Sequence, residues 1–158
     1  MTEDTNDQRL VEALARLQRL EDIDAIWRLC QRYRRHLDER DFAAYSRLFT
    51  DDGVWIGNLG SATGPEEIEQ LLVRTLELHP DPAVRHLHLV DNPVIEVDGD
   101  EGTAETTWVY ITRDFSDNPV LSLIGHYNDK LVRTEEGWKF KRREAYLDFP
   151  FQLQDFGE

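Results

Sequence analysis

The hydrophobic pattern of this 158-residue chain changes its period near residue 84, and this change limits the folds open to it. Before that point apolar residues recur every three or four positions, as on one face of an α-helix. After it they alternate with polar residues, as on the two faces of a β-strand. Helices followed by strands, with connections too short for parallel crossovers, predict an α+β domain with a mainly antiparallel sheet.

Helical spacing predicts two long helices at the start of the chain. Leu10, Leu14 and Leu17 mark a helix over residues 1–20. The acidic pair Glu21-Asp22 indicates the start of a second helix, which ends near Asp38. The apolar stripe of this second helix consists of Ile23, Ile26, Cys30, Tyr33 and Leu37.

Two shorter helices are expected next. Asp41 is placed to cap a helix over residues 42–49. The segment Thr63-Gly64-Pro65-Glu66-Glu67 is a helix-start signature, with either Thr63 or Gly64 as the cap. This helix is expected to run to about residue 78, because Pro80 and Pro82 cannot continue it.

Alternating patterns predict a short strand over residues 54–56 and then four long ones, over residues 84–97, 103–113, 120–133 and 138–147. The turns between the long strands are rich in Gly, Asp and Asn, so consecutive strands form a meander. We expect one domain over residues 1–158, with helices covering one face of a curved sheet and a small-molecule pocket between them. The apolar tail, residues 148–158, is expected to close the pocket or contact a neighbouring subunit.

Composition narrows the functional classes. A formal charge of −14 argues against nucleic acid and anionic membranes as partners, because the field of the protein repels both. Cys30 is the only cysteine, so no intrachain disulfide can form, and a cytoplasmic location is expected. The polar N-terminus indicates neither a signal peptide nor a membrane span.

Candidate acid/base residues stand at a helix end and on a strand. Asp38 lies in the last turn of a helix, where the helix dipole disfavours an anion by about 0.3–1 kcal/mol, and an ion pair with Arg34 is the simpler explanation for it. His86 and His88 share one strand face, where ordinary hydrogen-bonded histidines are also common. The His-x-His spacing lacks further ligands at fixed positions, so no metal is expected.

The last strand carries alternating cations. Strict alternation places Lys139, Lys141 and Arg143 on one face, opposite Trp138, Phe140 and Arg142. Such a face is usually solvated, although an arginine at its inner end could bind an anion. Ser122, His126 and Asp129 lack a Gly-x-Ser-x-Gly turn, and no Gly-rich phosphate loop is present, so nucleophilic and nucleotide chemistry are not expected.

Several segments together resemble the SnoaL-like proteins of the nuclear-transport-factor-2-like superfamily, over residues 21–147. They are Tyr33 to Phe42, Phe49 to Trp55, Gly64 to Ile68, Arg85-His86, Pro93 to Gly99 and Gly137 to Arg143. The resemblance implies a cone-shaped α+β barrel that encloses a pocket, and a homodimer or homotrimer. Because this scaffold hosts many activities, the resemblance bears on fold more than on function.

Within this family the motifs are most similar to those of bile-acid dehydratase and hexachlorocyclohexane dehydrochlorinase. The resemblance implies an acid/base pair of His86 and Asp38, with Tyr33 as proton donor or oxyanion partner and Arg143 stabilising the departing group. A histidine base positioned by a carboxylate contributes about 10²–10⁴-fold to such a step. The pocket walls are expected to be Trp55, His88, Trp108, Tyr110 and Phe140.

The expected function is therefore that of a lyase or isomerase of the dehydratase type, which needs no cofactor and acts on a small, apolar, oxygenated ring compound. Two alternatives remain open. One is a non-catalytic ligand-binding or structural subunit, like the small subunit of ring-hydroxylating dioxygenases. The other is a polyketide cyclase, which would use the same pair of residues on a different substrate.

Overall fold

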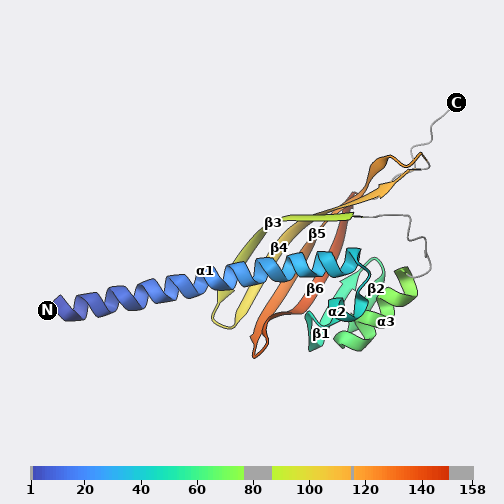
Figure 1. The fold of residues 1–158 in the computed structure, drawn as a ribbon. Coiled ribbons are helices and arrows are strands. Elements are labelled where there is room, and N and C mark those ends of the chain that lie inside the picture. The colour runs from blue at the N-terminus through green and yellow to red at the C-terminus, as the bar shows by residue number, and fades with distance from the viewer. Residues whose placement is uncertain (1, 77–86, 115, 150–158) are drawn as a thin grey trace.

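The computed structural model describes residues 2–76, 87–114 and 116–149, and Figure 1 shows their arrangement. Within these ranges three helices and six strands follow one another along the chain. The helices are α1 (Thr2–Asp38), α2 (Phe42–Ser46) and α3 (Gly64–Leu76). The strands are β1 (Phe49–Gly57), β2 (Gly60–Thr63), β3 (Leu87–Asp98), β4 (Glu101–Arg113), β5 (Pro119–Thr134) and β6 (Gly137–Phe149).

The first two predicted helices form one continuous helix, α1, so the boundary expected at Glu21-Asp22 is wrong. No Gly or Pro interrupts residues 2–38, and the side chain of Gln18 donates a hydrogen bond to Asp22 across the expected break, at 3.2 Å. An acidic pair alone does not stop a helix whose other residues favour it. The start of α1 projects beyond the sheet (Figure 1). No helix among the described residues combines the length and apolarity needed to cross a membrane.

The two short helices begin where the sequence predicts. Asp41 caps α2 by accepting a hydrogen bond from the backbone N–H of Ala44 at 2.9 Å. The side chain of Glu67 accepts a hydrogen bond from the backbone N–H of Thr63 at 3.0 Å, and this bond stabilises the start of α3. Gly64 has a φ of +80°, and a Cβ there would lie 2.7 Å from the carbonyl oxygen of Asp51, so only glycine fits this junction.

The six strands form one open, mixed sheet in the order β2-β1-β6-β5-β4-β3. The predicted antiparallel meander is confirmed from β3 to β6. No pattern in the sequence indicates that β1 pairs in parallel with β6, and sequence reasoning missed β2 altogether. Residues 51–53 suggest a turn, whereas they lie inside β1 at a shift in its register.

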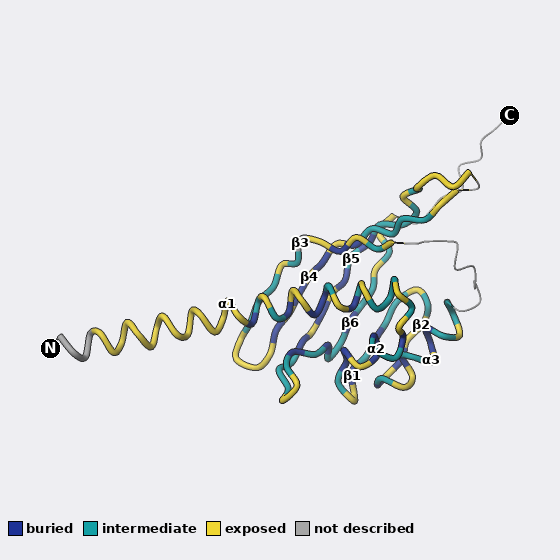
Figure 2. The backbone as a smooth tube through the Cα atoms, viewed as in Figure 1, coloured by how far each residue is buried: buried dark blue, intermediate teal, exposed yellow. Residues whose placement is uncertain are grey.

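The core lies between the helices and one face of the sheet, which we call the inner face. Helix α1 contacts β3 and β6, while α3 packs on β1 and β2. Figure 2 shows burial alternating along the strands and confined to one side of α1. The largest fully buried side chains are those of Arg143, Tyr33, Tyr45, Phe49, Phe140, Ile26, Leu29, Ile68, Leu72 and Leu131.

A bulge in β6 changes which residues of this strand face inward. Phe140 pairs with Leu131 and Arg142 pairs with Lys130, so Lys141 is the extra residue. Strict alternation placed Arg143 opposite Phe140, and this expectation is wrong because the bulge moves Arg143 to the inner face. Arg142 and Lys141 then face outward, where they pair with Glu144 and Asp52.

Candidate functional site

The end of α1 and the start of β3 bring an imidazole and a carboxylate into contact. The Nδ1 atom of His88 lies 2.7 Å from Oδ1 of Asp38. The backbone N–H of His88 donates to the same carboxylate, at 3.1 Å to Oδ1 and 3.3 Å to Oδ2. The two side chains are 15% and 11% exposed, so both are largely shielded from water. Two distant segments are thus joined through one carboxylate.

This contact determines the tautomer of His88. An ionised carboxylate only accepts hydrogen bonds, so Nδ1 must carry the donated proton. The neutral ring then keeps its lone pair on Nε2, the nitrogen that a general base uses. Arg34 also reaches Asp38, at 3.4 Å, so the ion pair weighed in the sequence is present beside the histidine contact.

Tyr110 on β4 lies beside the imidazole. Its ring centroid is 4.6 Å from that of His88, with 36° between the planes. Burial raises the pKa of Tyr110, the positive charge of Arg40 opposes this shift, and the charge of Asp38 adds to it. The phenol is therefore neutral at physiological pH. It shields one side of the imidazole from water.

His86, the histidine expected to pair with Asp38, lies outside the described residues. The imidazole that the structure places against Asp38 is that of His88, which the sequence assigned to a pocket wall. Both histidines fit the alternation of the strand. A one-dimensional pattern contains no signal for which of them reaches the end of α1.

Arg143 is fully buried at the inner face. Its Nε and Nη2 atoms donate to the two carboxylate oxygens of Asp129, at 2.7 and 2.5 Å. Its guanidinium carbon lies 3.9 Å from the ring centroid of Tyr33, 4.1 Å from that of Phe140 and 4.3 Å from that of Tyr127. The planar cation is thus fixed by a bidentate ion pair and by aromatic faces. Sequence reasoning missed Asp129 as its partner.

Burial dominates the titration of the groups around this ion pair. It raises the pKa of Asp129, an effect that the charge of Arg143 opposes. Burial and the neighbouring Tyr33 raise the pKa of Tyr45 and Tyr127 well above the usual range, so both phenols stay neutral. Burial also raises the pKa of the Cys30 thiol, again against the charge of Arg143, which makes this cysteine a packing residue.

Tyr33 holds the centre of a buried aromatic group. Its hydroxyl accepts a hydrogen bond from Tyr45 at 2.5 Å and another from the indole N–H of Trp55 at 3.0 Å. Both of these bonds use the acceptor capacity of the Tyr33 oxygen, and the hydroxyl of Tyr127 is a further hydrogen-bond partner of Tyr33. Tyr33 and Asp38 both lie on α1, five residues and about 7.5 Å apart along the helix.

The inner face of β4 connects the Arg143–Asp129 ion pair with the His88–Asp38 pair. Ala104 pairs with Asp129, and every second residue from there, through Thr106 and Trp108, leads to Tyr110 beside His88. Of the described side chains, Thr106 Oγ1, Trp108 Nε1 and Arg143 Nη1 are buried without a hydrogen-bond partner, as is His36 Nδ1. Unpaired buried donors are costly, so a ligand that accepted from them would be held firmly.

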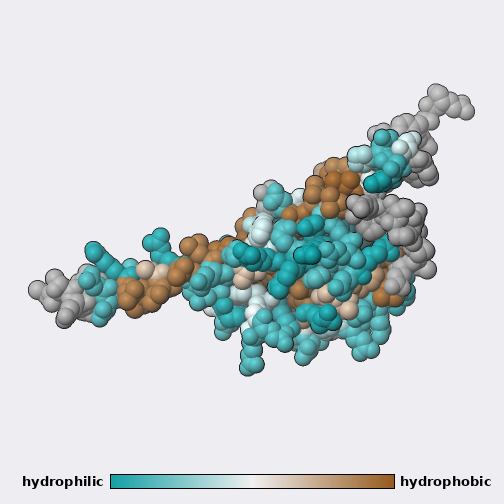
Figure 3. Space-filling view, viewed as in Figure 1, coloured by the Kyte–Doolittle hydropathy of each residue, from teal (hydrophilic) through white to brown (hydrophobic). Residues whose placement is uncertain are grey.

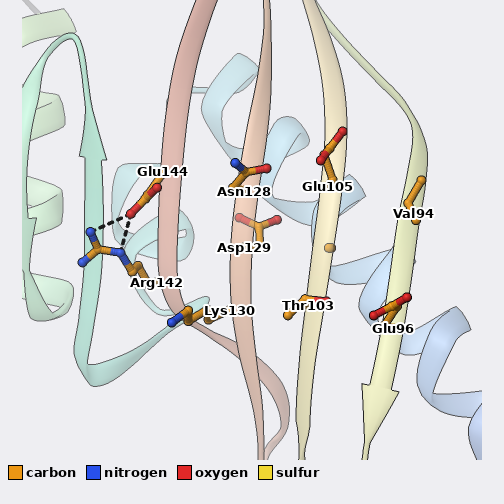
Figure 4. A pocket seen from close by; sticks show the side chains of 10 residues that line it. Val94, Glu96, Thr103, Glu105, Asn128, Asp129, Lys130, Arg142 and Glu144 are labelled. Atoms are coloured by element: carbon orange, nitrogen blue, oxygen red, sulfur yellow. Dashed lines mark hydrogen bonds and ion pairs between the residues drawn. The ribbon is translucent and has the colours of Figure 1, made fainter.

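The opposite, outer face of the sheet has a hollow of about 340 Å³, shown in Figure 4. Charged side chains from four strands surround it, among them Glu96, Glu105, Lys130 and Glu144. Arg142 and Glu144 pair with each other at 2.6 Å there. None of the residues predicted for the site lines this hollow. Among the described residues, no three His, Cys, Asp or Glu side chains are grouped to hold a metal.

Comparison with known proteins agrees with this architecture. The family model of the SnoaL-like domain matches residues 18–144, and the chain belongs to this family. No curated protein sequence matches it significantly.

Several solved structures share the fold. A nuclear-transport-factor-2-like protein with a cystatin-like fold from Novosphingobium aromaticivorans is 28% identical, with a TM-score of 0.79 over 88% of this chain and 90% of that one. ActVI-ORFA from Streptomyces coelicolor is 23% identical, with a TM-score of 0.68 over 80% of this chain and 97% of its own. Aln2 from another Streptomyces species is 17% identical, with a TM-score of 0.71 over 81% and 91%.

Proposed function

We propose that this protein is an acid/base enzyme, a lyase or isomerase of the dehydratase type that acts on a small, apolar, oxygenated ring compound. The observation that carries this proposal is the 2.7 Å contact between His88 Nδ1 and Asp38 in a shielded position. The family, which the match over residues 18–144 establishes, supports a small-molecule function. The reaction uses protein side chains only.

In the proposed reaction the Nε2 atom of His88 removes a proton from a ring carbon next to a carbonyl group. Asp38 stabilises the imidazolium that forms and keeps the ring in place, because it also binds the backbone N–H of His88. The electron pair of the broken C–H bond moves toward the carbonyl oxygen. In an elimination, the C–O bond of a neighbouring hydroxyl group then breaks, a C=C bond forms, and the proton from His88 leaves with that oxygen as water.

Tyr33, whose oxygen accepts from Tyr45 and Trp55, is proposed to donate its hydroxyl proton as a hydrogen bond to the oxygen on which charge develops. Arg143 is fully buried and bound to Asp129, so we assign it a positioning role rather than contact with the departing group. Its positive charge lies over the Tyr33 ring at 3.9 Å. This geometry stabilises partial negative charge on the Tyr33 oxygen.

Proton abstraction can be tested without knowing the substrate. The wild-type protein is incubated in D₂O with a panel of one- to four-ring ketones, and mass spectrometry measures deuterium uptake next to the carbonyl group. We expect uptake above the uncatalysed rate for at least one ring size. We also expect a loss of about 10²–10⁴-fold in His88→Gln and Asp38→Asn, the usual contribution of a positioned general base.

Two matched controls identify the histidine. His126 also pairs with an aspartate, Asp148, at 2.9 Å, so His126→Gln removes a similar contact that does not involve Asp38 or His88 and should leave exchange unchanged. His86→Gln tests the histidine two positions earlier in the sequence. Full activity of His88→Gln together with loss in His86→Gln would move the base to His86. Ring-ketone binding without exchange would contradict the enzymatic proposal and support a binding protein.

A further inference from the structure

Residues 2–20 of α1 form a helical arm that projects from the domain, and we call them the N-terminal arm. Every residue from 6 to 20 is exposed (Figure 2). Five large aliphatic side chains in this short stretch are 51–66% exposed, and in Figure 3 apolar surface is visible along the projecting helix. They are Leu10, Val11, Leu14, Leu17 and Leu20. The family match begins at residue 18, so most of the arm lies outside the matched region.

A solitary arm of this kind is poorly stabilised. Most helical stability in proteins comes from the packing of an apolar face against the rest of the structure, and the arm lacks such packing. Contiguous exposed apolar residues mark interaction surfaces. Leu10, Leu14 and Leu17 follow the spacing of such a face, because they recur after four and three residues.

The described residues of the domain do not cover the arm. Further along α1, the residues that pack on the sheet include Asp22, Ile26, Leu29 and Tyr33. At about 100° of rotation per residue, the stripe of Leu10, Leu14 and Leu17 is turned by roughly 120° from that face. If α1 is straight, the stripe therefore does not face the sheet, and the sheet leaves it uncovered.

The stripe matches a second copy of itself. A twofold axis between Ala13 and Leu14, with the two helices antiparallel, brings Leu10 of one arm opposite Leu17 of the other. The same operation brings Ala13 opposite Leu14, and the small alanine lets the helices approach at the centre. A patch that maps onto itself under a twofold axis is the requirement for a closed dimer interface.

Charge selects the antiparallel arrangement. Residues 21–158 carry 15 basic and 28 acidic side chains, which gives a formal charge of −13. Residues 1–20 carry three basic and four acidic side chains, so their charges nearly cancel. In an antiparallel pair centred between residues 13 and 14, the two Asp22 positions lie about 25 Å apart along the axis, more than two Debye lengths at physiological salt. A parallel pair would place the two acidic domains side by side.

We propose that the N-terminal arms of two copies pair as antiparallel helices through Leu10, Leu14 and Leu17, so that the two domains lie at opposite ends of the assembly. The overlap of residues 7–20 is about 20 Å long. An interface of this length is at the small end of specific protein interfaces, so the pairing depends on protein concentration.

Sedimentation velocity over a range of micromolar concentrations tests the pairing. We expect the wild type to shift toward a larger species as concentration rises. The double variant Leu14→Glu/Leu17→Glu should weaken this association at least ten-fold. Ala15→Glu is the matched control, since position 15 lies on the far side of the arm, and it should associate like the wild type. Equal association of all three proteins, or a wild type that stays monomeric throughout, would overturn the proposal.

Disulfide trapping tests the orientation. Cys30 is fully buried, so single cysteines placed on the arm react on their own. When Leu10→Cys and Leu17→Cys proteins are mixed and oxidised, antiparallel arms yield a disulfide between the two different variants. Parallel arms yield disulfides that join two copies of the same variant. Disulfides of the second kind, or none at all, would overturn the antiparallel pairing.

Discussion

At the scale of single residues, Asp22 joins the long helix to the far end of the sheet. Its carboxylate accepts hydrogen bonds from Arg133 at 2.7 and 2.6 Å and from the indole N–H of Trp138 at 3.1 Å. Arg133 also lies 4.8 Å from the ring centroid of Trp138. The side chain of Asp22 is almost completely buried. If Asp22 were replaced, the hydrogen-bond donors of Arg133 and Trp138 would therefore lose their buried acceptor.

We expect Asp22→Asn to lower the free energy of unfolding at pH 7 by about 2–4 kcal/mol, because the bidentate ion pair is lost while Arg133 remains. Urea denaturation measures the change. Asp24→Asn is the matched control, since Asp24 pairs with Arg28 on the exposed side of the same helix at 2.7 Å, and an exposed pair contributes about 0–1 kcal/mol. Equal losses in the two variants would contradict the role given to Asp22.

The same contact predicts a pH dependence. The hydrogen bonds from Arg133 hold the pKa of Asp22 below its ordinary value of 3.8. Burial opposes this shift, and the hydrogen bond from Trp138 adds to it. The folded state therefore binds fewer protons than the unfolded state near that pH. The stabilisation is complete above 3.8 and is lost as the pH falls through the lowered pKa of the folded state. We expect the stability difference between wild type and Asp22→Asn to shrink as the pH falls below 3.8; a constant difference down to the lowest pH would argue against it.

At the scale of elements, irregularities in the strands decide what faces the site. The extra residue Lys141 in β6 turns Arg143 inward. A second bulge, between Ile124 and Gly125, shifts the register of β5 against β6. At Gly125 a Cβ would lie 2.0 Å from the carbonyl oxygen of Tyr146 and 2.4 Å from the ring of Trp108. The glycine therefore lets the indole lie against the backbone of β5.

We expect Gly125→Ala to destabilise the domain by about 2–3 kcal/mol or more, because the new methyl group overlaps backbone atoms that cannot move alone. Thermal unfolding measures the change. Gly102→Ala is the matched control on β4, where the closest atom to a new Cβ is 3.1 Å away, and a much smaller loss is expected. If the two variants were equally stable, the close packing of Trp108 on β5 would be wrong.

At the scale of the whole molecule, the N-terminal arm lies outside the packed domain. The arm residues from 6 to 20 are exposed, and the buried face of α1 begins at Asp22. We expect removal of residues 1–17 to change the free energy of unfolding by less than about 1 kcal/mol when it is measured at protein concentrations too low for association, because few contacts cross this boundary. A larger loss would show that the arm packs on its own domain.

Much of the architecture follows from local chemistry that the sequence displays. The three-to-four-residue period of the first half and the alternation of the second half identify the helices and the meander strands. Asp41 and the segment around Gly64 mark two helix starts because capping and positive φ depend on one or two side chains. The SnoaL-like resemblance of residues 21–147 is confirmed by the family match over residues 18–144.

Other features depend on contacts that no local pattern contains. The parallel pairing of β1 with β6, the partnership of Arg143 with Asp129, and the choice of His88 to meet Asp38 join residues far apart in the chain. One bulge reverses the facing of every later residue in a strand, since the side-chain period is two. The sequence by itself determined the helical and strand halves of the chain, except for β2 and the continuity of α1, and which ionisable residues are available. The tertiary structure decided which of them meet, because register and bulges are set by packing against distant strands.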